Sequence, residues 1–157
     1  MNQSILSHKQ KIGNLFQKAS LMTDMEMQGH MARLLCVMVS GFIEQSLRTL
    51  LDEYSKNKSS PAIQRYVSSH TRKITNCKQN KILLILKDFS PEWSEKYDKE
   101  VRKIELVPNQ IKDSIDSVIA NRHNIAHGKD VGISLGTMAA YYNTIKKAIQ
   151  ILEKIIR

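Results

Sequence analysis

The stretch "MARLLCVMVSGFIEQSLRTLLDEYSK", residues 31–56, decides the fold. Its apolar residues recur at helical spacing, and at about 100° per residue they cover more than half of the helix circumference. They are Leu34, Leu35, Met38, Val39, Phe42, Ile43, Leu47, Leu50 and Tyr54. A helix that is apolar over so wide an arc belongs at the centre of a bundle or at a subunit interface. We expect it to span about residues 27–56.

The rest of the chain has the pattern of further helices and no convincing alternating strand. Helix breakers are scarce, with six glycines and three prolines, which favours an all-helical fold. Ser90 and Pro91 are typical of a helix start, and Gly128 is typical of a helix end. We predict an all-α bundle of about five to six helices in a single domain, residues 1–157. Further helices are expected within residues 2–22, 61–70, 80–89, 109–127 and 137–157, and another is expected to start at Ser90 and Pro91.

Several features restrict the class of protein. The two cysteines, Cys36 and Cys77, match no disulfide framework or metal-site spacing and are best interpreted as reduced thiols. The N-terminus lacks the apolar region of a signal peptide. The longest apolar run, residues 34–43, is about half of the roughly 20 residues that span a bilayer. We therefore expect a cytoplasmic protein without a membrane segment.

The chain carries 24 basic and 15 acidic residues, a formal net charge of +9. Such an excess favours polyanionic partners, because each Lys or Arg placed on a phosphate releases condensed counterions. A basic charge alone also fits a domain with no nucleic-acid partner. The charge makes RNA or DNA binding a hypothesis that needs a site.

The candidate site is "RHNIAHG", residues 122–128, at the end of the helix expected over 109–127. On a helical wheel Arg122 falls at the centre of the apolar stripe, within about 20° of Ile111 and Ile115. Either its stem packs in the core while its head reaches water or pairs with a buried acid such as Glu44, or its guanidinium receives a phosphate or carboxylate. The wheel does not decide between these interpretations.

The two histidines of this stretch also have two interpretations each. His127 lies at the negative end of the helix dipole, suited to acid–base work near neutral pH, but histidine is also a common residue at helix ends. His123 and His127 are four residues apart, as in a zinc pair. No other residue has the sequence spacing expected of a third zinc ligand, so we predict no metal and no other cofactor.

The segment "VIANRHNIAHG", residues 118–128, resembles the R-x4-6-H signature of the HEPN superfamily, and most closely its RiboL-PSP-like group. The stretch "GFIEQSLRTLLDEY", residues 41–54, is similar to the family's first core helix, which commonly carries an acid, here Glu44. The stretch 133–152 is similar to the helix that follows the motif. The resemblance is loose over most of the chain and tight over 118–128, and it places the motif near the end of the penultimate long helix.

The resemblance implies an RNA endonuclease that needs no metal, with Arg122 and His127 as catalytic residues. His123, Asn124 and Glu44 would be supporting residues. It further implies a homodimer with a composite active site, a toxin or anti-phage role, and an antitoxin or other defence-system protein as partner. Lys129 stands where some HEPN toxins have a tyrosine that a partner modifies, which makes that route of neutralisation doubtful.

Two other functions remain open. The chain could be a non-catalytic HEPN module that binds nucleotide, RNA or a partner protein. It could also be a helical adaptor in which Arg122 pairs with an acid and His127 only ends a helix. The same fold is expected in all three cases.

Overall fold

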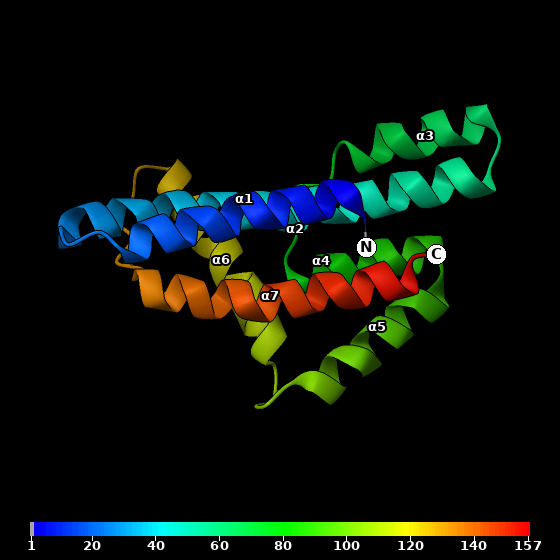
Figure 1. Ribbon diagram of the computed structural model, residues 1–157. Helices are drawn as coiled ribbons and strands as arrows, with labels where there is room; N and C mark the ends of the chain where they lie inside the picture. Colours follow the sequence, from blue (N-terminus) through cyan, green and yellow to red (C-terminus); the bar gives the residue numbers. More distant parts are fainter. Residues whose placement is uncertain (1) are drawn as a thin grey trace.

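The computed structural model describes residues 2–157, which form seven α-helices and no strand (Figure 1). The all-α prediction is confirmed, with slightly more helices than the expected five to six. Pro91 lacks a backbone N–H and Ser90 is extended, so the chain between residues 79 and 104 forms two separate helices. The seven are α1 (Gln3–Ser20), α2 (Met25–Lys58), α3 (Pro61–Thr71), α4 (Gln79–Phe89), α5 (Pro91–Ile104), α6 (Gln110–Ala126) and α7 (Leu135–Ile155).

The 34-residue helix α2 is the centre of the bundle, as its wide apolar arc predicted. It packs against α1, α3, α6 and α7. It begins two residues earlier than expected because the Asp24 carboxylate accepts hydrogen bonds from the N–H groups of Glu26 and Met27. By length and composition α2 could cross a membrane, although its longest apolar run, residues 34–43, is too short to span one. However, 61% of its most apolar 18 residues are buried within the protein, as in the core helix of a soluble bundle.

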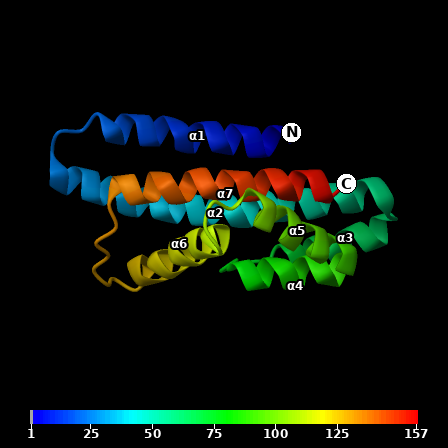
Figure 2. The same ribbon diagram turned by 90° about the horizontal axis from the view of Figure 1, so that it is seen from below.

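The other helices divide into two groups around α2. Figure 1 shows α1, α2 and α7 running side by side, with α6 crossing them steeply. Figure 2 shows α1 on one side of α2 and α3, α4 and α6 on the other. The α4–α5 pair closes the bundle, since α5 also packs on α7.

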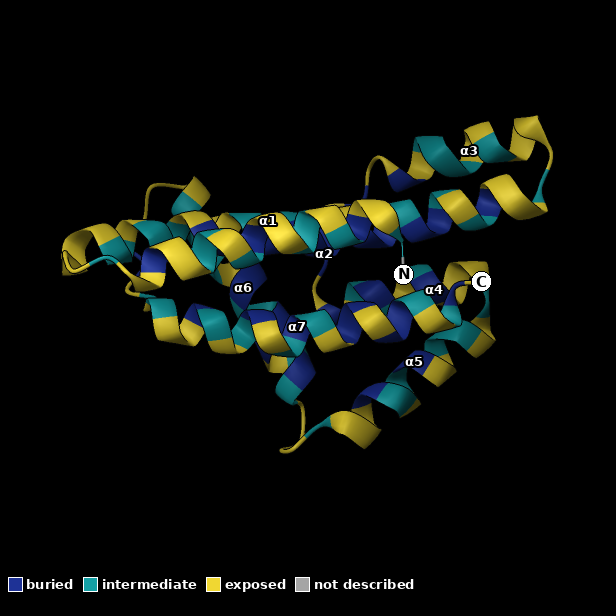
Figure 3. Cartoon of the chain, in the orientation of Figure 1, coloured by how far each residue is buried: buried dark blue, intermediate teal, exposed yellow. Residues whose placement is uncertain are grey.

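Burial follows this arrangement (Figure 3). The inward faces of α2 and α7 form most of the core, and the Tyr142 ring stacks on Phe16 and meets Phe42 edge-on. In contrast, α3 packs mainly on α2 and buries only Thr71. The face of α3 that points away from α2 is therefore largely exposed.

The helix α6 carries the motif, at the position in the chain that the resemblance implied. Its buried residues are Ile111, Ser114, Ile115, Val118 and Ile119. After Ile119 none of its residues is fully buried, and Figure 1 shows the end of α6 extending past α2 on the side of α3. The motif therefore lies on the part of α6 that leaves the core.

Candidate functional site

The last turn of α6 is closed by a pair of backbone hydrogen bonds that require Gly128. The N–H of Gly128 donates to the carbonyl of Ile125 at 3.1 Å, and the N–H of Lys129 to that of Asn124 at 2.9 Å. This is the Schellman arrangement, in which the residue after the cap takes a left-handed conformation; Gly128 has φ 70°. The predicted helix end is confirmed, and it fixes the backbone of His127, the cap residue.

Arg122 is half-buried, at the edge of the core. Its Nη1 donates to the Oδ1 of Asn76 at 3.0 Å, and no carboxylate lies within ion-pair distance of it in residues 2–157. The alternative of a direct ion pair with Glu44 is therefore not observed. The wheel also placed Arg122 in a buried stripe, but the stripe is covered only as far as Ile119 because α6 then passes beyond α2. Its positive charge is therefore held in place without being neutralised.

Glu44 is connected to Arg122 by hydrogen bonds through Asn76. The buried carboxylate of Glu44 accepts a hydrogen bond from the Asn76 N–H at 2.8 Å. Asn76 has φ 51°, a left-handed conformation that Asn adopts more readily than most residues. Its backbone thus binds α2 while its side chain binds α6. Sequence analysis missed Asn76, since only its tolerance of this conformation hints at its role.

The two histidines lie together on the exposed end of α6. Their ring centroids are 4.4 Å apart with the planes tilted by 54°, and both side chains are exposed. The described residues contain no group of three His, Cys, Asp or Glu side chains placed to hold a metal ion. Asn124 is half-buried, and its carbonyl helps to close the helix.

Arg122 and His127 are five residues apart, about 140° around the helix axis, and no hydrogen bond joins their side chains. The surface they form offers an uncompensated guanidinium, which can bind a phosphate, and imidazoles that can exchange a proton with a ligand.

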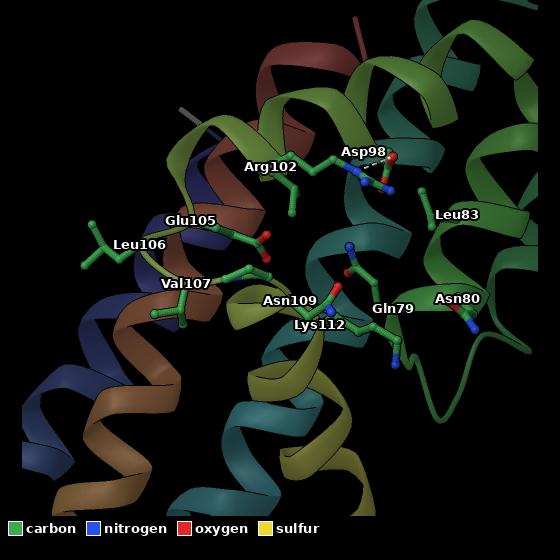
Figure 4. A pocket seen from close by; sticks show the side chains of 12 residues that line it. Gln79, Asn80, Leu83, Asp98, Arg102, Glu105, Leu106, Val107, Asn109 and Lys112 are labelled. Atoms are coloured by element: carbon green, nitrogen blue, oxygen red, sulfur yellow. Dashed lines mark hydrogen bonds and ion pairs between the residues drawn. The ribbon is translucent and has the colours of Figure 1, made fainter.

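A cavity of about 450 Å³ between α4, α5 and α6 contains none of the predicted site residues (Figure 4). Most charges along it are paired within the protein. Arg102 donates to Asp98 at 2.9 Å, and Glu105 accepts from the Ile111 N–H at 2.9 Å. This cavity lies at the opposite end of α6 from the motif.

The two cysteines are not candidate nucleophiles. Both are fully buried, and burial raises the pKa of each thiol to about 11. At neutral pH they stay protonated, and the Cys36 thiol donates to the Val118 carbonyl at 3.4 Å between α2 and α6. Their role is packing.

Comparison with known proteins identifies the family of this chain. The family model described as RiboL-PSP-HEPN matches residues 2–157, essentially the whole chain. No curated protein and no solved structure gives a significant match. The match over the whole chain shows the family, and the protein belongs to the RiboL-PSP-HEPN family.

Proposed function

We propose that this HEPN protein is a metal-independent RNA endonuclease. The observation that carries the proposal is the state of Arg122, a guanidinium fixed by an amide, with no carboxylate against it, beside two exposed histidines. A guanidinium held in this way is suited to a phosphate, because no carboxylate of residues 2–157 lies within ion-pair distance of it.

The reaction would be attack by a ribose 2′-hydroxyl on the adjacent phosphorus. The hydroxyl oxygen forms the new P–O bond, the P–O5′ bond breaks, and the products are a 2′,3′-cyclic phosphate and a 5′-hydroxyl. His127 would transfer the proton from the 2′-hydroxyl to the leaving O5′, which typically contributes 10²–10⁴-fold to the rate. Arg122 would stabilise the charge on the phosphorus oxygens. His123 and Asn124 would support the site, and Glu44 would position Arg122 through Asn76.

The active form would be a homodimer in which two copies of the motif line one cleft. Along α2, the face that the end of α3 and the loop 72–78 contact at Glu44, Arg48 and Asp52 continues toward the N-terminus as an exposed stripe. Its apolar side chains are Met27, Leu34 and Val37, each at least 40% exposed. Apolar residues exposed beside the motif favour a second copy as their cover.

The cellular role would be that of a cytoplasmic toxin or anti-phage effector, with an antitoxin or other defence-system protein as a further partner. This part rests on the family alone. A helix that is buried as extensively as α2 supports the absence of a membrane partner.

The test is incubation of the purified protein with single-stranded RNA, with and without a chelator. We expect cleavage in both cases and a cyclic phosphate at the new 3′ end. Loss of cleavage with the chelator would contradict the metal-independent mechanism. RNA that is bound but never cut, over a range of pH and salt, would favour the non-catalytic module.

A further inference from the structure

The net charge of this chain is concentrated in one segment. Residues 54–87 contain no Asp or Glu and eight Lys or Arg residues, whereas the rest of the chain has 16 basic and 15 acidic residues. The eight are Lys56, Lys58, Arg65, Arg72, Lys73, Lys78, Lys81 and Lys87. None of them takes part in an ion pair within residues 2–157. Nearly all of the +9 is therefore presented by one quarter of the chain, without internal neutralisation.

This basic segment covers the C-terminal end of α2, all of α3, the loop 72–78 and most of α4. The loop is fixed to the bundle, since Arg48 donates to the Ile74 carbonyl at 3.1 Å and Asp116 accepts from the Gln79 N–H at 2.9 Å. The same loop carries Asn76, the partner of Arg122. The basic segment thus leads directly to the motif.

A groove of about 650 Å³ runs between α3 and α4 within this segment. Its lining is mostly apolar and ends at Ile74, two residues before Asn76. The exposed side chains on it include Tyr66, 63% exposed, and Ile63, 52% exposed. One acid, Asp88, lies along the groove just beyond the basic segment.

The Tyr66 ring is held in place without being covered. The centroids of the Tyr66 and His70 rings are 4.2 Å apart, and the His70 Nδ1 donates to the Tyr66 carbonyl at 2.9 Å. An exposed aromatic ring within a basic segment is the kind of group on which single-stranded nucleic acids stack their bases.

We propose that the α3–α4 groove and the eight basic residues of the segment 54–87, together called the α3 platform, bind single-stranded RNA and guide it to Arg122 and His127. The phosphates would contact the unpaired cations and a base would stack on Tyr66. A second copy of this chain is a poor occupant, because it would bring the same positive charge to the same face. The guiding role rests on the proposed function, whereas the binding surface does not.

The first test removes three cations of the α3 platform, Arg65→Gln, Arg72→Gln and Lys73→Gln, in one variant. Its binding to a single-stranded DNA of about 12 nucleotides is measured by fluorescence anisotropy across a salt series. DNA has the same phosphates and lacks the 2′-hydroxyl, so binding is measured without cleavage. We expect weaker binding and a log–log salt slope that is smaller by about 2, because each lost phosphate contact removes about 0.7.

The matched control removes the same charge elsewhere, with Lys11→Gln, Lys18→Gln and Lys147→Gln, all exposed on α1 and α7. We expect a salt slope unchanged from that of the original protein. Equal loss in both triple variants would show that total charge alone matters and would overturn the α3 platform. Original affinity in the first variant would overturn it as well.

The second test addresses the base contact. Tyr66→Ala should weaken DNA binding about 5- to 100-fold, whereas Tyr66→Phe, which keeps the ring, should bind as the original protein does. Polyglutamate, which has charge and no bases, should bind Tyr66→Ala and the original protein equally. If Tyr66→Ala loses polyglutamate to the same extent, the surface fits an acidic protein and the RNA proposal is wrong.

These outcomes separate the two proposals. If the α3 platform variants lose binding while the original protein never cuts RNA, the platform stands and the nuclease fails. If they bind and cut like the original protein, the platform fails and the nuclease stands.

Discussion

The two ends of α6 use charge in opposite ways. At the N-terminal end, Lys112 pairs with Asp116 at 2.6 Å, and Asp116 also accepts from the Gln79 N–H of α4. At the C-terminal end, Arg122 meets only a neutral amide, and His123 and His127 are exposed. The first half of α6 therefore uses its charges to join α6 to α4, and its C-terminal end presents side chains that are free to bind a ligand. Substitutions at the two ends should therefore have opposite effects.

The largest effect on activity is expected at the C-terminal end. Arg122→Ala and His127→Ala should each lower the rate of RNA cleavage by at least about 10²-fold, because each removes a group from the reacting phosphate. The thermal midpoint and the dimer mass should stay unchanged, as measured by circular dichroism and light scattering. Lys112→Ala, at the other end of the same helix, is the control and should cleave normally. Unfolding of either motif variant would favour a purely structural role for the motif.

Asp116→Ala should instead lower stability and leave the cleavage activity of the folded protein unchanged. It leaves the Gln79 N–H and the Lys112 ammonium without their acceptor, so the free energy of unfolding should fall by about 1–3 kcal/mol. Denaturant unfolding measures this loss, and cleavage by the remaining folded protein should be normal. An activity loss as large as that of His127→Ala would end the division of α6 into two functions.

A smaller effect is expected where α2 supports the motif. Asn76→Gly keeps the left-handed backbone and its N–H bond to Glu44 but removes the amide that holds Arg122. Activity should fall about tenfold with little change in stability, since a displaced guanidinium stabilises the transition state less well. Asn76→Ser at the same place is the control for polarity without reach. Unchanged cleavage in Asn76→Gly would show that Arg122 needs no positioning.

Gly128→Ala should act on the helix end alone. An added Cβ meets no atom within 4 Å, so the cost arises from φ 70° and is about 1–2 kcal/mol. Thermal unfolding measures it. Activity should fall only if the substitution displaces the backbone of His127, the cap residue of α6. The same substitution at Gly136, in the first turn of α7, should be neutral or slightly stabilising.

The last effect depends on pH and concerns the buried thiols of the core. Burial raises the pKa of Cys36 and Cys77 to about 11 from about 9, so the unfolded chain loses its thiol protons at a lower pH than the folded one. Stability from these thiols is complete below pH 9 and declines as pH rises toward 11. Denaturant midpoints measured from pH 8 to 11 should fall progressively, and less so in a Cys36→Ala variant, compared at equal starting stability. A midpoint that is constant across this range would contradict the buried, protonated thiols.

Local features of the fold were predictable and the contacts between distant segments were not. The wide apolar arc of α2 and the helix end at Gly128 follow from residue spacing and from the conformation that glycine permits. The helix start at Ser90 and Pro91 was predicted as well, and the helix that begins there, α5, makes the seventh, one more than the expected five to six.

The site shows the limit most clearly. Sequence periodicity placed Arg122 in the apolar stripe, but it cannot tell where the neighbouring helix ends and exposure begins. The contact of Arg122 with Asn76 joins residues 46 positions apart, through a loop that no periodicity describes. The motif residues were found because a family pattern pointed to them, whereas the residue that positions Arg122 required the structure.

One modified substrate tests whether the C-terminal end of α6 supplies the residues that cleave RNA through the RNA's own 2′-hydroxyl. The purified protein is given a short RNA with a known cut site and the same RNA with a single 2′-deoxy residue at that site. We predict that the first is cut to a cyclic phosphate and a 5′-hydroxyl, and that the second binds equally well and stays intact. Cleavage of the deoxy substrate at the same bond would falsify the internal nucleophile and, with it, the role assigned to Arg122 and His127.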